Sequence, residues 1–241
     1  MTIVIPMAGL SKRFIDAGFI LPKYMLYVGA QSVFNITVSS FKKYFASKKF
    51  LFIIRNIFDT KNFIENECRL IGIKKYEIII LDSPTKGQAD TVYQGVTSSK
   101  VPDNESMLIF NIDTIRHDYS FPEELIDCDG YLEVFKGSGG NWSYAEPADE
   151  KSTLVKRTAE KVEISNLCST GLYYFKKKSD FCQACQHFQD HLLKEHYISP
   201  LYNYLIKDGR RIHYNLIRNE DVAFTGIPSE YMNLLRSRIK Y

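Results

Sequence analysis

The sequence has no long apolar run, no disulfide framework and no marked excess of charge of one sign. No uninterrupted apolar segment approaches the roughly 20 residues that a membrane-spanning helix needs. The N-terminus begins with a strand-like segment rather than a basic leader, which argues against a secretory signal. Five cysteines, an odd number without dense spacing, are typical of reduced thiols in a cytoplasm. These absences predict a soluble cytoplasmic protein that does not associate with a membrane.

The charge balance and the glycine pattern exclude further classes of protein. The 31 basic and 28 acidic residues are interspersed and give a net charge of only +3, so nucleic acid is not an expected partner. The sequence lacks the G-x-x-x-x-G-K-[ST] motif of P-loop proteins, and no G-x-G-x-x-G motif follows a strand. At 241 residues and 45% hydrophobic content, the chain can form one large α/β domain or two small ones.

Short apolar strands alternate with helical segments through the first half of the chain. Runs of apolar and β-branched residues predict strands at 2–6, 50–54, 77–81 and 107–111. Apolar spacing predicts helices at 32–44, 59–71 and 89–98, with Ser32 as the N-cap of the first. This alternation is typical of βαβ units and predicts a mainly parallel sheet flanked by helices.

From about Gly130 the predicted strands are shorter and are separated by turns. They lie at 131–135, 142–145, 153–156, 172–175, 212–216 and 222–224. Helices are predicted at 181–196, 198–207 and 228–240. We therefore expect an α/β fold of one domain, residues 1–241, with a first half at about 1–128 and a smaller β-rich half at about 129–241.

The segment after the first strand has the composition of an anion-binding turn. It joins small residues to two adjacent cations and reads Met7-Ala8-Gly9-Leu10-Ser11-Lys12-Arg13. Small residues let backbone N–H groups approach a phosphate closely. Arg13 adds a planar fork of donors, and Lys23 adds a mobile point charge. An ordinary strand-to-helix loop with solvated cations is the alternative; as an anion site, the segment indicates a nucleotide-handling enzyme.

A second polar segment follows the strand predicted at 77–81. Ligands bind beyond the carboxyl ends of strands in open α/β sheets. Gly87 allows a close backbone approach, and Gln88 offers both a donor and an acceptor, which reading the edge of a pyrimidine requires. Helix capping by Thr85 or Asp90 is the alternative explanation.

A third polar segment, Asn111-Ile112-Asp113, ends the strand predicted at 107–111. A carboxylate at this edge of a parallel sheet is well placed to hold Mg²⁺, which takes few protein carboxylates and otherwise binds water and phosphate oxygens. Asp221 or Glu230 could supply a second carboxylate, although each is also explained as a surface residue. The alternative for Asp113 is a helix or turn cap.

A fourth group lies in the second half of the chain. Lys161, after Glu160, precedes a predicted strand and could direct a second cation toward a bound acceptor. The Ser169-Thr170-Gly171 turn could supply hydroxyl and backbone donors. Taken singly, a solvated lysine and a strand turn explain the same residues.

Together, and in this order, these segments resemble the nucleotidyltransferases that couple a nucleoside triphosphate to a sugar phosphate or a similar phosphate monoester. Their M-A-G-x-G-[ST]-R-F…P-K pattern is matched by residues 7–14 and by Pro22-Lys23, with Ser11 and Lys12 replacing the second glycine and the Ser or Thr. G-Q-A-[DE]-[ST] is matched at 87–91, E-K at 160–161, T-G-[IL]-Y-Y-F at 170–175 and F-x-G-[TI]-P at 224–228. Tyr24 and Phe224 stand where the family often has Pro and Asp.

The resemblance implies a Rossmann-like (GT-A-like) fold, Mg²⁺ as cofactor and a role for each matched residue. Arg13, with Lys12, would hold the β- and γ-phosphates, Lys23 the α-phosphate and Lys161 the acceptor phosphate. The expected nucleotide-binding residues of the first half are Met7, Ala8, Gly9, Leu10, Ser11, Lys12, Arg13, Lys23, Thr85, Gly87, Gln88, Ala89, Asn111 and Asp113. The expected acceptor-binding residues of the second half are Tyr144, Glu160, Lys161, Ser169, Thr170 and Gly171.

The compact chain looks most like the small bacterial cytidylyltransferases of capsule and surface-polysaccharide pathways, which use CTP with acceptors such as phosphocholine or phosphoglutamine. Three alternatives stay open: a thymidylyl- or uridylyltransferase acting on a hexose 1-phosphate, a GT-A glycosyltransferase, and a degenerate nucleotide-binding protein. A GT-A glycosyltransferase usually carries a D-x-D motif, which Asn111-Ile112-Asp113 is not. The sequence does not reveal the oligomeric state, and a homodimer is one possibility.

Overall fold

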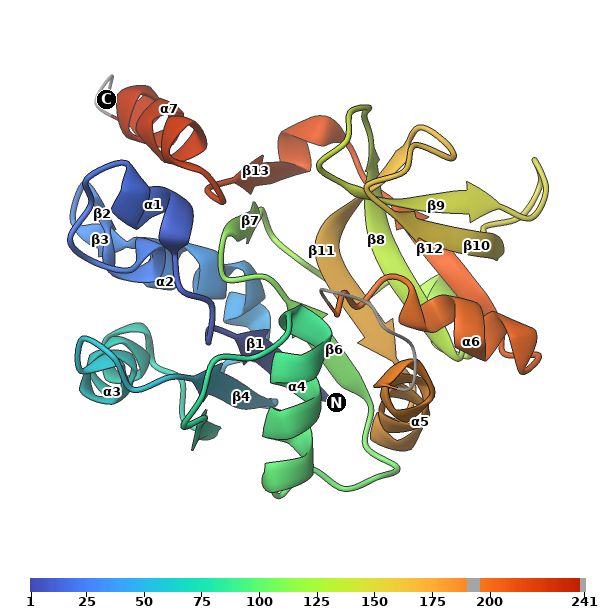
Figure 1. Cartoon of the computed structure of the whole chain (residues 1–241), viewed down its shortest axis with the longest axis horizontal. Helices are drawn as coiled ribbons and strands as arrows, with labels where there is room; N and C mark the ends of the chain where they lie inside the picture. The colour runs from blue at the N-terminus through green and yellow to red at the C-terminus, as the bar shows by residue number, and fades with distance from the viewer. Residues whose placement is uncertain (190–195, 239–241) are drawn as a thin grey trace.

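A nine-stranded mixed sheet forms the centre of the protein in the computed structural model, which describes residues 1–189 and 196–238 (Figure 1). The main path of the sheet runs β10-β9-β11-β6-β1-β4-β5, and β8 pairs with both β11 and β12. The strands are β1 (Thr2–Pro6), β4 (Lys49–Ile54), β5 (Tyr76–Ile80), β6 (Met107–Phe110), β8 (Gly130–Lys136), β9 (Ser143–Pro147), β10 (Val155–Glu160), β11 (Leu167–Phe175) and β12 (Ile212–Leu216).

The four strands β5, β4, β1 and β6 are parallel to one another and come from the first half of the chain. Strand β11 pairs with β6 in the antiparallel direction. The strands β1, β4 and β6 are mainly apolar and buried because both faces of the sheet are covered there, whereas the edge strand β5 is only partly buried. Ile3 and Ile5 pack into one core, and Val4 between them packs into the other. All three side chains are fully buried.

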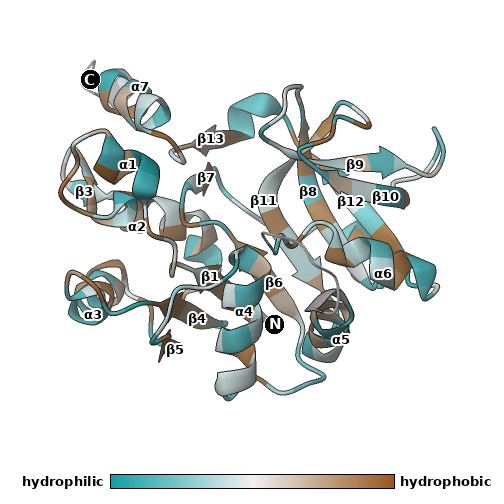
Figure 2. Cartoon of the chain, in the orientation of Figure 1, coloured by the Kyte–Doolittle hydropathy of each residue, from teal (hydrophilic) through white to brown (hydrophobic). Residues whose placement is uncertain are grey.

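Helices cover both faces of the sheet, and the central strands carry the most hydrophobic colouring (Figure 2). On the Val4 face lie α4 (Gln88–Ser98), α5 (Lys178–Gln189) and α6 (Leu201–Lys207). On the opposite face lie α2 (Val33–Val38), the 3₁₀ segment η2 (Ser39–Tyr44) and α3 (Thr60–Ile71). This is a three-layered α/β arrangement.

Shorter elements lie outside the main sheet, and among them α1 and β7 follow the carboxyl ends of β1 and β6 (Figure 1). A two-stranded ribbon joins β7 to β13 and brings the C-terminal part of the chain beside the loop that follows β6. These elements are α1 (Lys12–Asp16), η1 (Lys23–Met25), β2 (Tyr27–Val28), β3 (Gln31–Ser32), β7 (Thr114–Arg116), η3 (Glu123–Leu125), η4 (Asn219–Asp221), β13 (Val222–Phe224) and α7 (Pro228–Arg238).

The structure confirms the α/β class and the mixed sheet flanked by helices, and it corrects individual elements. The helix predicted at 32–44 is divided, because Phe41 has non-helical angles (φ −104°, ψ 21°) within the 3₁₀ continuation of α2. The short α1, η1 and β7 were not predicted. The C-terminal parts of the helices predicted at 181–196 and 228–240 extend into residues outside the described ranges. Within the described residues, no helix has the length and apolar character to cross a membrane.

Ser32 caps α2 as its sequence position predicted, and it has a second partner. Its buried hydroxyl oxygen accepts a hydrogen bond from the Asn35 backbone N–H (3.0 Å) and donates to Oε2 of Glu67 on α3 (2.8 Å). Glu67 is itself buried. One hydroxyl therefore completes a helix start and satisfies a carboxylate.

We expect Ser32→Ala to lower the free energy of unfolding by about 1–3 kcal/mol, because it removes the cap and leaves Glu67 without a buried donor. Urea denaturation monitored by circular dichroism measures this loss. The control is Ser98→Ala, at an exposed position at the end of α4, which should change stability by less than about 0.5 kcal/mol. Equal effects of the two variants would contradict the assignment.

Candidate active site

The loop after β1 carries a strained residue at the position where the glycine of the sequence pattern is replaced. Ser11 adopts the left-handed conformation (φ 50°, ψ 30°) at the start of α1, a region that favours glycine. Its hydroxyl oxygen accepts a hydrogen bond from the Lys23 backbone N–H (3.3 Å). The serine thus keeps the backbone shape and ties the loop to Lys23.

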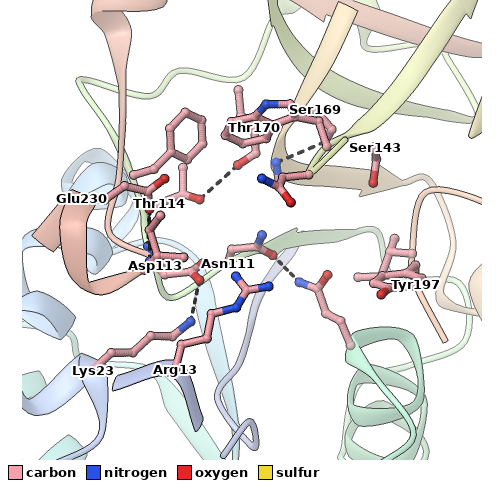
Figure 3. A pocket seen from close by; sticks show the side chains of 18 of the residues that line it. Arg13, Lys23, Asn111, Asp113, Thr114, Ser143, Ser169, Thr170, Tyr197 and Glu230 are labelled. Carbon is pink, nitrogen blue, oxygen red and sulfur yellow. Dashed lines mark hydrogen bonds and ion pairs between the residues drawn. The ribbon is translucent and has the colours of Figure 1, made fainter. Parts of the chain in front are cut away.

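Lys23 and Asp113 form an ion pair at the centre of the site. Lys23 Nζ lies 2.5 Å from Asp113 Oδ2, and the two side chains are 21% and 22% exposed, so each keeps a face toward solvent. Arg13, from the first turn of α1, extends toward the same place (Figure 3). Lys12 instead pairs with Asp16 one helical turn later, and both of those side chains are largely exposed.

Two adjoining cavities open at this ion pair. The first, here called the loop cavity, has a volume of about 660 Å³ and lies between residues 6–11 and residues 84–88. The second, the sheet cavity, has a volume of about 480 Å³ and lies between α1, β11 and the segment 224–230. Five residues line both: Ser11, Lys23, Gln88, Asn111 and Asp113. The two cavities therefore form one cleft with Asp113 at its junction.

The structure brings together most of the residues predicted to bind the nucleotide. The loop cavity is lined by Met7, Ala8, Gly9, Leu10, Ser11, Lys23, Thr85, Gly87, Gln88, Asn111 and Asp113. Lys12 and Arg13 line the sheet cavity. Ala89 lines neither cavity, because its side chain lies on the face of α4 that is buried in the core.

The two amides at the junction contact one another. Gln88 Nε2 donates a hydrogen bond to Asn111 Oδ1, so α4 and the end of β6 are joined across the cleft (Figure 3). Gly87, at φ 143°, lies against the segment at residue 196, where a Cβ would stand 2.6 Å from the His196 carbonyl oxygen. The backbone bonds from Ala89 N–H to His196 O and from His196 N–H to Lys86 O (both 2.9 Å) hold that contact.

Four of the predicted acceptor-binding residues line the sheet cavity: Glu160, Ser169, Thr170 and Gly171. Tyr173 lines it as well, and burial raises the pKa of its hydroxyl to about 12. That hydroxyl stays protonated at neutral pH and can donate a hydrogen bond, but it cannot act as a base there.

Tyr144 and Lys161 lie elsewhere. Tyr144 is fully buried and donates its hydroxyl proton to the Gly139 carbonyl, so its side chain faces the core rather than the cleft. Lys161 does not line either cavity; its ammonium donates to the Tyr197 hydroxyl and lies 4.6 Å from the centroid of that ring. Tyr197 does line the sheet cavity, so Lys161 stands behind it.

The two candidates for a second carboxylate are placed differently. Glu230, in the first turn of α7, lines the sheet cavity and accepts N–H bonds from Gly226 (2.8 Å) and Ile227 (3.2 Å). A Cβ at residue 226 would stand 3.0 Å from Asp113 Oδ2 and 3.6 Å from Glu230 Oε2, so the carboxylates of Asp113 and Glu230 are close neighbours. Asp221 lies outside both cavities and pairs with Arg218 (2.7 Å), whose hydrogen bonds lower the pKa of Asp221.

Several cavity residues were not predicted from the sequence. Those outside every matched segment reach the cleft only through tertiary packing: Thr114, Asn141, Ser143, Tyr197 and Ile198. Phe224 and Ile227 also line the sheet cavity, and both lie in the segment matched at 224–228. Thr114 directly follows Asp113 and could have been included on that ground. The other residues could have been suggested as site residues only by their closeness in sequence to the matched segments.

Comparisons with known proteins identify the family of the chain. No protein-family model and no curated protein matches the chain. Among solved structures, a nucleoside-diphosphate-sugar pyrophosphorylase from Vibrio cholerae RC9 is 48% identical, with a TM-score of 0.93, over 97% of this chain and 99% of the other. The chain belongs to the sugar-phosphate nucleotidyltransferase family.

More distant structures share the fold of this nucleotidyltransferase. An inositol-1-phosphate CTP transferase from T. maritima is 13% identical, with a TM-score of 0.76, over 99% of this chain and 96% of the other. A putative glucose-1-phosphate thymidylyltransferase from Bacillus anthracis is 16% identical, with a TM-score of 0.78, over 100% and 96% of the two chains. The names of these two proteins refer to different nucleotides, so the shared fold does not decide between bases.

Gly171 is the residue of this nucleotidyltransferase at which a side chain would disturb the cleft most directly. It has φ 88°, and a Cβ there would stand 2.2 Å from Asn111 Nδ2. We expect Gly171→Ala to push Asn111 away from Gln88. The matched control is Gly72→Ala, at the end of α3, where φ is 85° and nothing lies within 4 Å of the added Cβ.

Both substitutions force alanine into the left-handed region, at a cost of about 1 kcal/mol or more. Gly171→Ala should cost about 1–3 kcal/mol beyond Gly72→Ala because it also overpacks a buried contact. Chemical denaturation of the two variants measures the difference. Equal losses would show that the contact with Asn111 is readily relieved.

Proposed function

We propose that the protein transfers a CMP group from CTP to a phosphate-bearing acceptor and releases pyrophosphate, in the synthesis of a capsule or surface-polysaccharide precursor. One observation carries the proposal: Arg13, Lys23 and Asp113 line the same cavity, although up to 100 residues separate them in the sequence. That convergence is what a bound polyphosphate requires.

The reaction proposed is an in-line displacement. An oxygen of the acceptor phosphate forms a bond to the α-phosphorus of the triphosphate, and the bond from that phosphorus to the β-phosphate bridge breaks. The acceptor needs no general base, because the second pKa of a phosphate monoester is about 6 and the oxygen is already ionised at neutral pH. The high pKa of Tyr173 agrees with a mechanism in which no side chain removes a proton.

Charge repulsion is the main obstacle to this reaction. A triphosphate and an acceptor phosphate together bring roughly six negative charges into one cleft. Arg13 would bind the β- and γ-phosphates, Lys12 would assist from the exposed turn, and Lys23 would contact the α-phosphate. Lys161 would reach the acceptor phosphate from its position on the Tyr197 ring. These cations would hold the reacting atoms in line while charge develops.

The residues at the junction suit Mg²⁺. Asp113 and Glu230 place two carboxylates side by side, and Mg²⁺ in such enzymes takes one or two carboxylates and completes its shell with water and phosphate oxygens. When bound, the ion would neutralise phosphate charge. Among the described residues, no larger group of His, Cys, Asp or Glu side chains gathers as a metal site, which fits an ion held largely by its substrate.

The choice of CTP rests on the likeness of the sequence to the small cytidylyltransferases, and the polar edge of the loop cavity supports a pyrimidine base. Gln88 and Asn111 present amide donors and acceptors there, and a pyrimidine offers a complementary edge. A thymidylyl- or uridylyltransferase acting on a hexose 1-phosphate is the second candidate, because the Vibrio cholerae relative is named a nucleoside-diphosphate-sugar pyrophosphorylase.

A pyrophosphate-release assay tests the function. The purified protein with Mg²⁺ is offered CTP, UTP, dTTP, ATP and GTP, each with a panel of sugar 1-phosphates, phosphocholine and other phosphate monoesters. We expect the wild type to release pyrophosphate with CTP and one class of acceptor. We expect no release from Asp113→Asn, because this side chain has nearly the shape of aspartate but lacks the charge that would bind the metal. Faster release with UTP or dTTP and a hexose 1-phosphate would support the second candidate and exclude CTP as the main donor.

Lys23→Ala should lower kcat/KM by about 100-fold or more, as expected for a group that stabilises charge in the transition state. Lys61→Ala on α3 is the control, because Lys61 is half-exposed and forms only an i,i+4 pair with Glu65; it should behave like the wild type. Steady-state kinetics at saturating acceptor measure both. Near-normal turnover of Lys23→Ala would remove Lys23 from the proposed mechanism.

A further inference from the structure

A fully buried carboxylate lies beneath the acceptor side of the cleft and has no part in the mechanism above. Glu133, on β8, has 0% exposure and does not line either cavity. Arg116 Nε lies 3.1 Å from its Oε1 and 3.0 Å from its Oε2. A buried carboxylate is costly unless it is paired and hydrogen-bonded, so the arrangement around it calls for an explanation beyond packing.

Glu133 faces an irregularity in the neighbouring strand. In the antiparallel pairing of β11 with β8, Ser169 is opposite Val134 and Tyr173 is opposite Leu132. Residues 170–172 of β11 therefore stand across from Glu133 alone, which makes a β-bulge. The Thr170 hydroxyl donates to Glu133 Oε1 (3.2 Å), so the carboxylate is hydrogen-bonded to the first residue of the bulge.

The bulge and its bonds lead directly into the cleft. Ser169, Thr170 and Gly171 line the sheet cavity, and Figure 3 shows the first two there. The Thr114 hydroxyl donates to the Thr170 carbonyl (3.1 Å). The Asn111 N–H donates to the Gly171 carbonyl (3.3 Å). The position of the bulge therefore also sets that of the chain on both sides of Asp113.

Arg116 provides the second connection. It ends β7, which begins at the residue after Asp113, and its guanidinium also donates to the His117 carbonyl (2.6 Å). One carboxylate thus joins the strand that leaves Asp113 to the bulge that faces the acceptor. Hydrogen-bonded networks of this kind fix geometry because each member restricts the next.

We propose that Glu133 is a positioning residue for the acceptor: through Arg116 and Thr170 it fixes the bulge at residues 169–171 relative to Asp113. The kinetic part of this inference rests on the proposed nucleotidyl transfer. Because the loop cavity lies on the other side of Asp113, loss of the Glu133 charge should disturb the acceptor more than the triphosphate.

Glu133→Gln is the main variant, since it keeps the shape and removes the charge that pairs with Arg116. We expect the acceptor KM to rise about tenfold or more and kcat to fall, because small displacements of a bound reactant cost rate steeply. The KM of the triphosphate should stay within about threefold of the wild type. Parallel changes in both KM values, or no change in either, would overturn the proposal.

Asp180→Asn is the matched control. Asp180, on α5, is a buried carboxylate paired with Arg210 (3.3 Å), and it lines neither cavity. Its loss should lower the melting temperature and leave both KM values unchanged. If Asp180→Asn shifts the acceptor KM as much as Glu133→Gln does, the effect is one of general stability and the proposal fails.

Amide hydrogen exchange separates this inference from the proposed function, because it needs no activity. In Glu133→Gln, peptides covering residues 111–116 and 167–175 should exchange at least tenfold faster than in the wild type. The exchange rates of peptides from β4 and β5 should stay the same. This result would support positioning even for a protein that releases no pyrophosphate. If the exchange rate rises equally across the whole sheet, or if both Glu133→Gln and Arg116→Lys unfold, Glu133 contributes to stability alone and the proposal fails.

Discussion

Asp113 is the point at which distant parts of the chain are held together. Its carboxylate pairs with Lys23 (2.5 Å), the twenty-third residue of the chain. Its carbonyl accepts the Thr225 N–H (2.8 Å) and the Thr225 hydroxyl (3.1 Å) from near the C-terminus. The strand that positions it, β6, lies between β1 and β11 in the sheet. Both ends of the cleft are therefore fixed relative to one residue.

This placement has an electrostatic consequence. Lys23 and Asp113 are each about one-fifth exposed, so the pair is partly desolvated and its attraction is only partly screened. In the proposed mechanism an incoming polyphosphate would compete with the carboxylate for the same ammonium, and a cation bound by Asp113 would relieve that competition. Lys23 and Asp113 neutralise one another within the ion pair, and under the proposed mechanism each would exchange this partner for the polyphosphate or the metal ion.

The sequence predicted the parts of the structure that depend on local pattern. The parallel strands could be recognised because burial on both faces makes them apolar throughout, as at Phe50 to Ile54. The residues near Asp113 could be predicted to meet because strand ends gather at one edge of such a sheet. Ser32 could be recognised as a cap because its chemistry is that of a helix start.

What the sequence could not predict depends on contacts between distant segments. Nothing local distinguishes Glu133 from a solvent-facing residue of a strand; only the pairing of β8 with β11 buries it against Thr170. Tyr144 lies in an expected strand, yet alternation along a strand sends neighbouring side chains to opposite faces. Tyr144 consequently enters the core, and Tyr197 takes the place beside the cleft. Lys161 follows β10 with a left-handed backbone (φ 59°), and its ammonium packs on the Tyr197 ring.

The departures from the family pattern each have a local compensation in the fold. Ser11 keeps the left-handed backbone of the glycine it replaces and adds a bond to Lys23. Tyr24, in place of proline, is buried and its hydroxyl is hydrogen-bonded to Thr60 (2.9 Å). Phe224 stands where the family often has Asp, so that position carries no carboxylate. Its ring packs against Trp142, with ring centroids 4.7 Å apart. Glu230 and Asp113 flank residue 226 and both line the sheet cavity, so a second carboxylate is present in the cleft although position 224 has none. The aromatic pair makes the wall of the sheet cavity less polar than the family pattern implies.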